Sequence, residues 1–151
     1  MNADYYLLAR DENLAVYYFV SEGSRGRIKK GIFFQLVDEE EQLYNLAFGD
    51  WNDEIGHLDD VVRTDNGDTQ KVLNTVAVAV VDFMTKNPGA KLMARGSTSS
   101  RTRLYQMNIL RNWQEISEHF DVQGVKDGQF EVFCNGVNYE AFLLTKRLLT
   151  L

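Results

Sequence analysis

Three strand patterns come before the first helical pattern in this chain, and their order constrains the fold more than any other feature. Residues 14–21 are rich in aromatic and β-branched side chains, which favour strands, and residues 27–37 and 42–48 alternate with the two-residue period of a strand. The linking segments, 21–26 and 38–41, are too short for a crossover between parallel strands. We therefore expect an antiparallel meander of at least three strands.

Two helices are expected after the meander. Short polar residues at 64–68 favour a helix start, so the first helix is predicted over residues 68–85, where Asn87-Pro88-Gly89 then ends it because proline blocks continuation. The second helix is predicted over residues 99–119. Each carries an apolar face at helical spacing, formed by Leu73, Val76, Val80 and Met84 in the first and by Tyr105, Ile109, Ile116 and Phe120 in the second.

The remaining strands complete the predicted fold. A short strand is expected at 90–95, another at 122–125, and a hairpin around Asn135-Gly136, a strong two-residue turn signal. The predicted order, β-β-β-α-β-α-β-β, indicates an α+β fold, a largely antiparallel sheet of about six strands with two helices packed on it. Because the chain shows no linker or repeat, residues 1–151 are expected to form a single domain.

Composition narrows the class of protein and its environment. No apolar run approaches the ~20 residues that a membrane span needs, and residues 1–10 lack the basic-then-apolar pattern of a secretory signal. Cys134 is the single cysteine, which excludes an intramolecular disulfide and a multi-cysteine metal site. We therefore expect a cytoplasmic protein.

Charge is distributed unevenly along the chain. The net charge is −6, but residues 1–75 hold 7 basic and 15 acidic side chains, a balance of −8, and residues 76–151 hold 9 and 7, a balance of +2. Residues 91–114 contain no acid, whereas residues 50–68 are strongly acidic. An acidic protein repels a polyanion at long range. This disfavours broad nucleic-acid binding and leaves a local basic site or docking surface.

The segment from Gly96 to Arg103 is the candidate anion site. A predicted strand leads into a loop of small residues that opens a helix, where free N–H groups and the helix dipole favour an anion. The loop hydroxyls add donors, and the arginines offer bidentate contacts to phosphate or carboxylate. The candidate residues are Gly96, Ser97, Thr98, Ser99, Ser100, Arg101 and Arg103. In the purely structural alternative, Ser97 or Ser99 caps the helix and the arginines pair with acids of residues 50–68.

These features favour a non-enzymatic binding or interaction module with an anionic partner: phosphate, a nucleic-acid end or an acidic protein surface. No catalytic motif stands out, and we expect no cofactor and no metal. The alternative is a small metal-dependent phosphoester or nucleotide enzyme, in which residues 50–68, with His57, would hold a divalent ion opposite the arginines. Cys134 lacks a thiolate-stabilising neighbourhood, so we expect a half-buried structural thiol.

A second basic cluster, Arg25, Arg27, Lys29 and Lys30, lies in the meander. Edge strands often carry lysine, which prevents pairing between sheets. We therefore expect this cluster to mark an edge strand, although it would extend the anion site if it lay near Arg101.

Several short stretches resemble an uncharacterised family of short bacterial proteins, a domain of unknown function. They are Tyr44–Asp50, Asn66–Asp68, Lys71–Val76, Gly96–Thr98 and Arg101–Tyr105. The resemblance covers about residues 19–142, and its middle section, residues 72–105, is also similar to phage-encoded proteins of unknown function. It implies a recurring helix–strand–helix unit and assigns no catalytic residue, cofactor or substrate.

Overall fold

The computed structural model describes residues 4–11, 16–54, 57–58 and 65–147. The chain divides into two compact units, the first made of Met1–Gln35 with Ala47–Phe83 and the second of Leu36–Leu46 with Met84–Leu151. Strands β3 (Gly26–Asp38) and β4 (Leu43–Asn52) and helix α1 (Thr69–Lys86) contribute residues to both units. The single domain expected over residues 1–151 stays a prediction.

The fold is mixed α and β with a mostly antiparallel sheet, but the number and order of elements differ from the prediction. The described residues form three helices, eight strands in hydrogen-bonded succession and β5 (His57–Leu58) paired with β4. We expected about six strands and two helices. Within the described ranges, no helix is long and apolar enough to cross a membrane.

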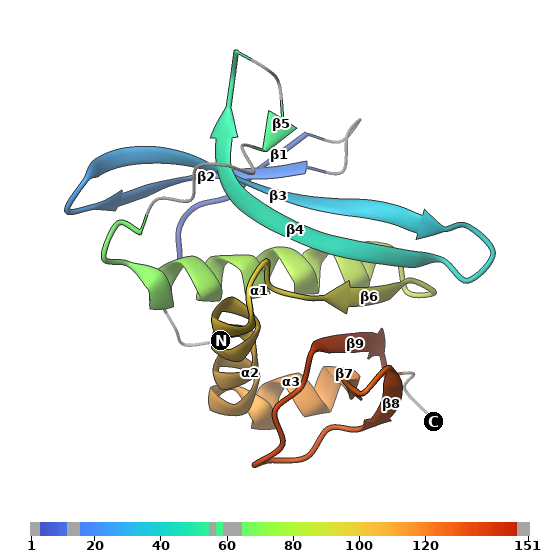
Figure 1. Cartoon of the computed structure of the whole chain (residues 1–151). Coiled ribbons are helices and arrows are strands. Elements are labelled where there is room, and N and C mark those ends of the chain that lie inside the picture. Colours follow the sequence, from blue (N-terminus) through green and yellow to red (C-terminus); the bar gives the residue numbers. More distant parts are fainter. Residues whose placement is uncertain (1–3, 12–15, 55–56, 59–64, 148–151) are drawn as a thin grey trace. The chain divides into compact units, whose positions relative to one another are not determined.

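The first unit contains the predicted meander. Its strands are neighbours in the order β1 (Ala9–Asp11), β2 (Val16–Gly23), β3 and β4 (Figure 1). The three predicted strands correspond to β2, β3 and β4, and β1 adds to them by pairing antiparallel with β2. Helix α1 begins and ends one residue later than predicted, and Asn87 follows its last residue.

Aromatic side chains fill the core of the first unit. The Phe34 and Phe83 rings stack at 4.1 Å, and the Tyr17 ring meets Phe34 edge-on at 5.7 Å. The Tyr17 hydroxyl donates to Asp82 Oδ2 at 2.5 Å. Burial, together with this carboxylate, raises the pKa of Tyr17 well above its ordinary value. The apolar face of α1 therefore packs on β2 and β3.

The second unit contains a five-strand arrangement that ends at β8. Its strand order is β4, β6 (Lys91–Ala94), β9 (Ala141–Lys146), β7 (Phe120–Lys126) and β8 (Gln129–Val132). Strands β4 and β6 pair in parallel, whereas the pairs β6–β9, β9–β7 and β7–β8 are antiparallel. The parallel pair follows from the connection through α1, because a helical crossover returns the chain in the same direction.

The predicted second helix is two helices. Helix α2 (Ser99–Arg111) and helix α3 (Trp113–His119) meet at Asn112, which lies outside helical backbone at φ −107° and ψ 22°. The Asn112 side chain donates to the carbonyl of Asn108 at 3.0 Å, and such local bonds from asparagine compete with helix continuation. The apolar stripe runs on through the break, so periodicity alone did not reveal it.

The hairpin predicted at Asn135-Gly136 is wrong. Strands β8 and β9 lie on opposite sides of β7. The two-residue hairpin is instead at Asp127-Gly128, where φ is +51° and +75°, the positive pair that a type I′ turn requires. Asn135-Gly136 forms a turn in the connection from β8 to β9.

The basic cluster of the meander does not mark an edge. Strand β3 lies between β2 and β4. Lys30 is buried and its ammonium lies 2.5 Å from Asp50 Oδ1, and Lys29 lies 2.9 Å from Asp53 Oδ1. The hydrogen bond from Lys29 holds the pKa of Asp53 below its usual value. The lysines therefore neutralise acids of β4 and the residues just after it.

Candidate functional site

The loop before α2 is shaped by one glycine and one threonine. Gly96 is buried and its N–H donates to Thr102 Oγ1 at 3.0 Å. A Cβ at this position would lie 2.4 Å from the Thr102 nitrogen, so only glycine fits. Thr98 is the N-cap, and its hydroxyl accepts the Arg101 N–H at 3.2 Å. The expectation that Ser97 or Ser99 caps the helix is therefore wrong.

The two candidate arginines lie on different sides of α2. Two residues along a helix correspond to a rotation of about 200°, so their side chains leave the helix in nearly opposite directions. The Arg103 guanidinium donates to Asn138 Oδ1 at 2.7 Å. Within the described part of the second unit, neither guanidinium forms a salt bridge.

A cavity of about 310 Å³ lies in the second unit between α2 and the turn that follows β8. Its lining combines one guanidinium, three side-chain amides and three apolar side chains, and it contains no carboxylate. The lining residues are Arg103, Gln106, Met107, Leu110, Asn135, Gly136, Val137 and Asn138. An arginine with neutral amides and no acid offers complementary contacts to an anionic group.

The turn beside this cavity is fastened to the sheet and to α2. The Tyr139 ring lies against Gly124, where a Cβ would come within 2.3 Å of the ring. The Tyr139 hydroxyl accepts the Cys134 N–H at 2.9 Å, and burial raises its pKa. Gln106 donates to the Val137 carbonyl at 2.5 Å and accepts the Tyr139 N–H at 3.3 Å. These bonds hold the turn in place and so form the cavity before any guest arrives.

The structure brings only part of the predicted set to this cavity. Arg103 lines it. Ser97, Ser99 and Ser100 are exposed at the start of α2. Cys134 is exposed rather than half-buried, because the chain leaves the sheet after β8.

The acidic stretch is committed largely to contacts within the first unit. Asp50 and Asp53 pair with lysines, and Asp65 accepts the Gly67 N–H at 2.9 Å. Asp59 and Asp60 lie outside the described residues. Over the ranges that the structure describes, no group of three metal-ligating side chains occurs.

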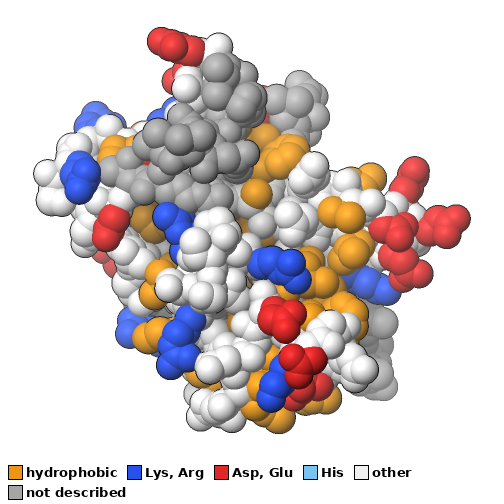
Figure 2. Space-filling model, in the orientation of Figure 1, with side chains coloured by type: hydrophobic (Ala, Val, Ile, Leu, Met, Phe, Trp, Pro, Cys, Tyr) orange, Lys and Arg blue, Asp and Glu red, His pale blue; other side chains and the backbone are white. Residues whose placement is uncertain are grey.

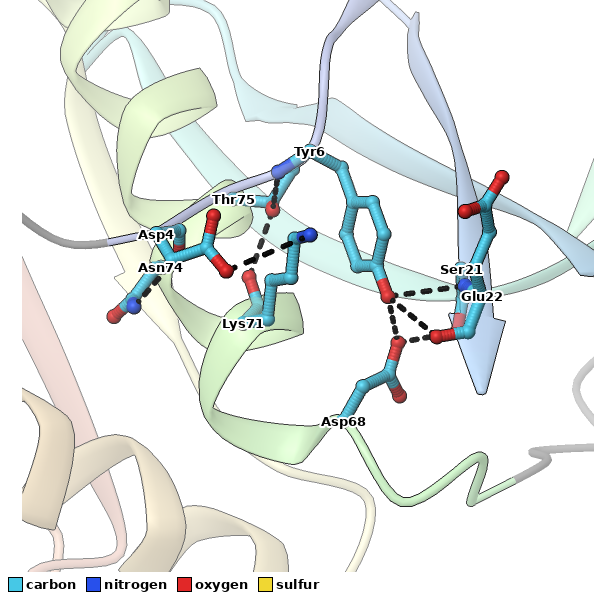
Figure 3. Close-up of polar contacts among 8 residues, drawn as sticks. All are labelled: Asp4, Tyr6, Ser21, Glu22, Asp68, Lys71, Asn74 and Thr75. Atoms are coloured by element: carbon cyan, nitrogen blue, oxygen red, sulfur yellow. Dashed lines mark hydrogen bonds and ion pairs between the residues drawn. The ribbon is translucent and has the colours of Figure 1, made fainter. Parts of the chain in front are cut away.

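A second polar cluster, in the first unit, surrounds Asp68 (Figure 3). Asp68 Oδ2 accepts hydrogen bonds from the hydroxyls of Tyr6 and Ser21, each at 2.5 Å. The Glu22 N–H donates to the Tyr6 hydroxyl at 3.0 Å, and the Lys71 ammonium lies 4.2 Å from the centre of the Tyr6 ring. These contacts bind residues 4–8 and β2 to the start of α1.

Asn66 extends this cluster to the β2–β3 turn. It is 1% exposed, and its amide donates to Ser21 Oγ at 3.1 Å and to the Gly26 carbonyl at 2.9 Å. Its side-chain oxygen, Oδ1, accepts the Arg25 backbone N–H at 2.6 Å. The polar atoms of the cluster are satisfied by each other, which is the arrangement of a structural anchor.

Comparison with known proteins identifies a family. A family profile described as a Family of unknown function (DUF6934) matches residues 2–147. The chain belongs to this family. No curated protein and no solved structure matches it. The DUF6934 match confirms the resemblance to a domain of unknown function, while the bacterial and phage parts of that resemblance stay predictions.

Most residues that line the cavity of this DUF6934 chain carry no sequence signal of a site. Asn138 accepts a hydrogen bond from Arg103, and Gln106 donates one to the Val137 carbonyl. Neither residue belongs to a motif in the sequence. Asn135-Gly136 did signal a turn, but we assigned it to a hairpin. The correct assignment required knowing that β8 and β9 flank β7.

Proposed function

We propose that this chain is a non-enzymatic binding module that takes an anionic group of a partner at Arg103. The observation that carries the proposal is the cavity lining, in which an arginine is accompanied by amides and apolar side chains without any carboxylate. The hydrogen bond to Asn138 orients the guanidinium and leaves its other N–H groups for a guest. The start of α2, with Ser99 and Ser100, extends the same basic, acid-free segment.

The cavity favours an anion that also has an apolar part. Met107, Leu110 and Val137 supply apolar contact beside the charged and amide groups. A carboxylate or phosphate would bind the guanidinium, while its attached carbon chain would cover these side chains. An acidic segment of a partner protein matches this combination better than bare nucleic acid, because it carries apolar side chains beside its carboxylates, whereas a nucleic acid is a dense polyanion that the net charge of −6 repels more strongly.

The metal-dependent enzyme has less support. Asp50 and Asp53, two of the acids of residues 50–68 that were expected to hold the ion, already bind Lys30 and Lys29. A divalent ion at these two carboxylates would have to displace both lysines. We therefore do not propose a hydrolytic or nucleotide activity.

A titration followed by amide NMR tests the binding proposal. Adding butyrate or inorganic phosphate should shift the amide signals of residues 103–107 and 135–138. We expect Arg103→Ala to weaken butyrate binding at least about tenfold, since a charge-assisted contact contributes roughly 1.5–3 kcal/mol. Arg111→Ala is the matched control, because Arg111 is also exposed on α2 and does not line this cavity.

The two variants decide the outcome. Loss of the shifts in Arg103→Ala with retention in Arg111→Ala supports the proposal. Equal weakening in both variants would mean that the anions only screen the basic helix, and it would overturn the assignment of the site. Thermal unfolding of each variant checks that the fold is intact.

A further inference from the structure

Strand β8 ends the strand order of the second unit with one edge that pairs with no strand among the described residues. All four of its residues are exposed, and two of them are apolar, Phe130 at 54% and Val132 at 75%. Natural proteins usually protect such an edge with lysine, proline, a bulge or a very short strand. Strand β8 is short, but it contains no lysine and no proline.

The hydrogen-bond pattern shows which backbone groups of β8 face away from β7. The pairs Lys126↔Gln129 and Gly124↔Glu131, and the bond from the Phe133 N–H to the Val122 carbonyl at 3.3 Å, follow one alternation. Residues 129, 131 and 133 therefore bond to β7, and the N–H and C=O of Phe130 point outward. The Val132 N–H also points outward, while its carbonyl lies 3.4 Å from the Tyr139 hydroxyl.

One register would let this edge pair with itself. In an antiparallel pair of two β8 strands related by a two-fold axis, the apolar side chains of both copies should lie on the same face of the sheet. A register shifted by one residue would put them on opposite faces, because side chains alternate along a strand. Centring the axis on Phe130 would place the two Phe130 residues opposite each other and each Glu131 opposite a Gln129. Moving the centre to Glu131 would set two carboxylates directly opposite, which is destabilising.

We propose that β8 is an interaction surface for a second copy of this chain, joined edge to edge about a two-fold axis at Phe130. The outward N–H and C=O groups of the two Phe130 residues would bond to each other, and the two phenyl rings would be covered together. Across the strands, Lys126 lies opposite Gln129, and Gln129 would lie opposite Glu131 of the second copy. The positive charge of Lys126 and the negative charge of that Glu131 would therefore lie on the same face of the joined sheet. This proposal is independent of the anion site.

Charge substitution at the axis provides a sharp test. Sedimentation equilibrium should show that the wild-type chain is a dimer in reversible exchange with monomer as its concentration is raised from micromolar to millimolar. Phe130→Lys and Phe130→Glu should each be monomeric, because each places two like charges opposite each other. An equimolar mixture of the two variants should recover a dimer, since lysine then faces glutamate.

The matched control is Val81→Lys, a substitution at another exposed apolar residue, 40% exposed on α1, which should leave the dimer unchanged. Circular dichroism establishes that every variant is folded. A wild-type chain that stays monomeric throughout the concentration range would overturn the proposal, and so would a dimer that both Phe130 variants retain. A dimer disrupted by the single variants and not recovered in the mixture would overturn the placement of the axis.

Discussion

Helices α1 and α2 each begin after a short run of small polar residues, Asn66-Gly67-Asp68 before one and Ser97-Thr98 before the other. Before α1, the side chains turn away from the helix: Asn66 holds the β2–β3 turn and Asp68 binds Tyr6 and Ser21. Before α2, Thr98 caps its own helix with its side chain. Similar residues thus make tertiary contacts in the first unit and a local contact in the second.

Burial explains why the two helix starts differ. Asn66 is 1% exposed, and a buried amide must find partners for all its polar atoms. The residues before α2 are exposed apart from Gly96, so water satisfies whatever the cap does not. The polar residues before α1 therefore stabilise the tertiary fold, whereas those before α2 stabilise one helix end and leave groups available to a ligand.

The charged turn between β3 and β4 offers a contrasting surface in the second unit. Figure 2 shows the acidic side chains projecting there, and Asp38, Glu39, Glu40 and Glu41 are all exposed. Glu41 binds Lys91 at 2.8 Å. The acid-free segment from 91 to 114 therefore belongs to a unit that also presents a cluster of acids, so a partner's charge would decide which of these surfaces it approaches.

Asn66→Ala should give the largest loss of stability among the variants considered. It removes the partners of Ser21, the Gly26 carbonyl and the Arg25 N–H, and we expect the free energy of unfolding to fall by about 3 kcal/mol. Urea denaturation measures this change. Asp65→Ala is the control, because Asp65 is exposed and makes a single local bond to the Gly67 N–H. Equal losses in the two variants would contradict the conclusion that Asn66 stabilises the tertiary fold while Asp65 makes only a local turn contact.

Tyr6→Phe should have an intermediate effect, with an expected loss of about 2 kcal/mol at neutral pH. The variant leaves the Glu22 N–H without its acceptor and Asp68 without one of its two donors. Burial, with Asp68 beside it, raises the pKa of Tyr6 above its ordinary value of 10.0. The unfolded chain therefore loses this proton first as the pH rises, and the free energy of unfolding falls above pH 10.0.

Tyr6→Phe should also make the free energy of unfolding fall less steeply at alkaline pH, because phenylalanine has no proton to lose. Urea denaturation at a series of pH values from neutral to alkaline measures the slope. Tyr17 retains its own contribution, so part of the decline should remain. Tyr5→Phe, at an exposed tyrosine, is the control and should leave the free energy of unfolding at neutral pH unchanged. A Tyr6→Phe variant whose slope equals that of the wild type would exclude Tyr6 as a source of the decline.

Local patterns were sufficient to predict the elements whose partners are close in the sequence. The alternation at 27–37 and 42–48 and the stop at Asn87-Pro88-Gly89 correspond to β3, β4 and the end of α1. Non-local pairing was not predictable in this way. Asp127-Gly128 and Asn135-Gly136 both signal turns, and only the position of β9 on the other side of β7 decides which one closes a hairpin.

The candidate site was predictable to a similar extent. Arg103 stood out because residues 91–114 carry basic residues without acids. Its separation from Arg101 follows from helix geometry, but the facing residue, Asn138, lies 35 positions away and has no sequence signal. Lys30 likewise looked like a surface charge, although it lies among the buried residues of β3 with Asp50 as its partner.

Thr98→Ala should have a smaller effect than Asn66→Ala or Tyr6→Phe, a loss of about 1 kcal/mol, which is typical of removing an N-cap hydroxyl. Ser97→Ala should change the free energy of unfolding by less than ~0.5 kcal/mol, because Ser97 is exposed and does not cap. Urea denaturation compares the two, and Thr98→Asn should restore most of the loss, since asparagine also caps well. A greater loss in Ser97→Ala than in Thr98→Ala would move the cap to Ser97 and remove the difference between the two helix starts.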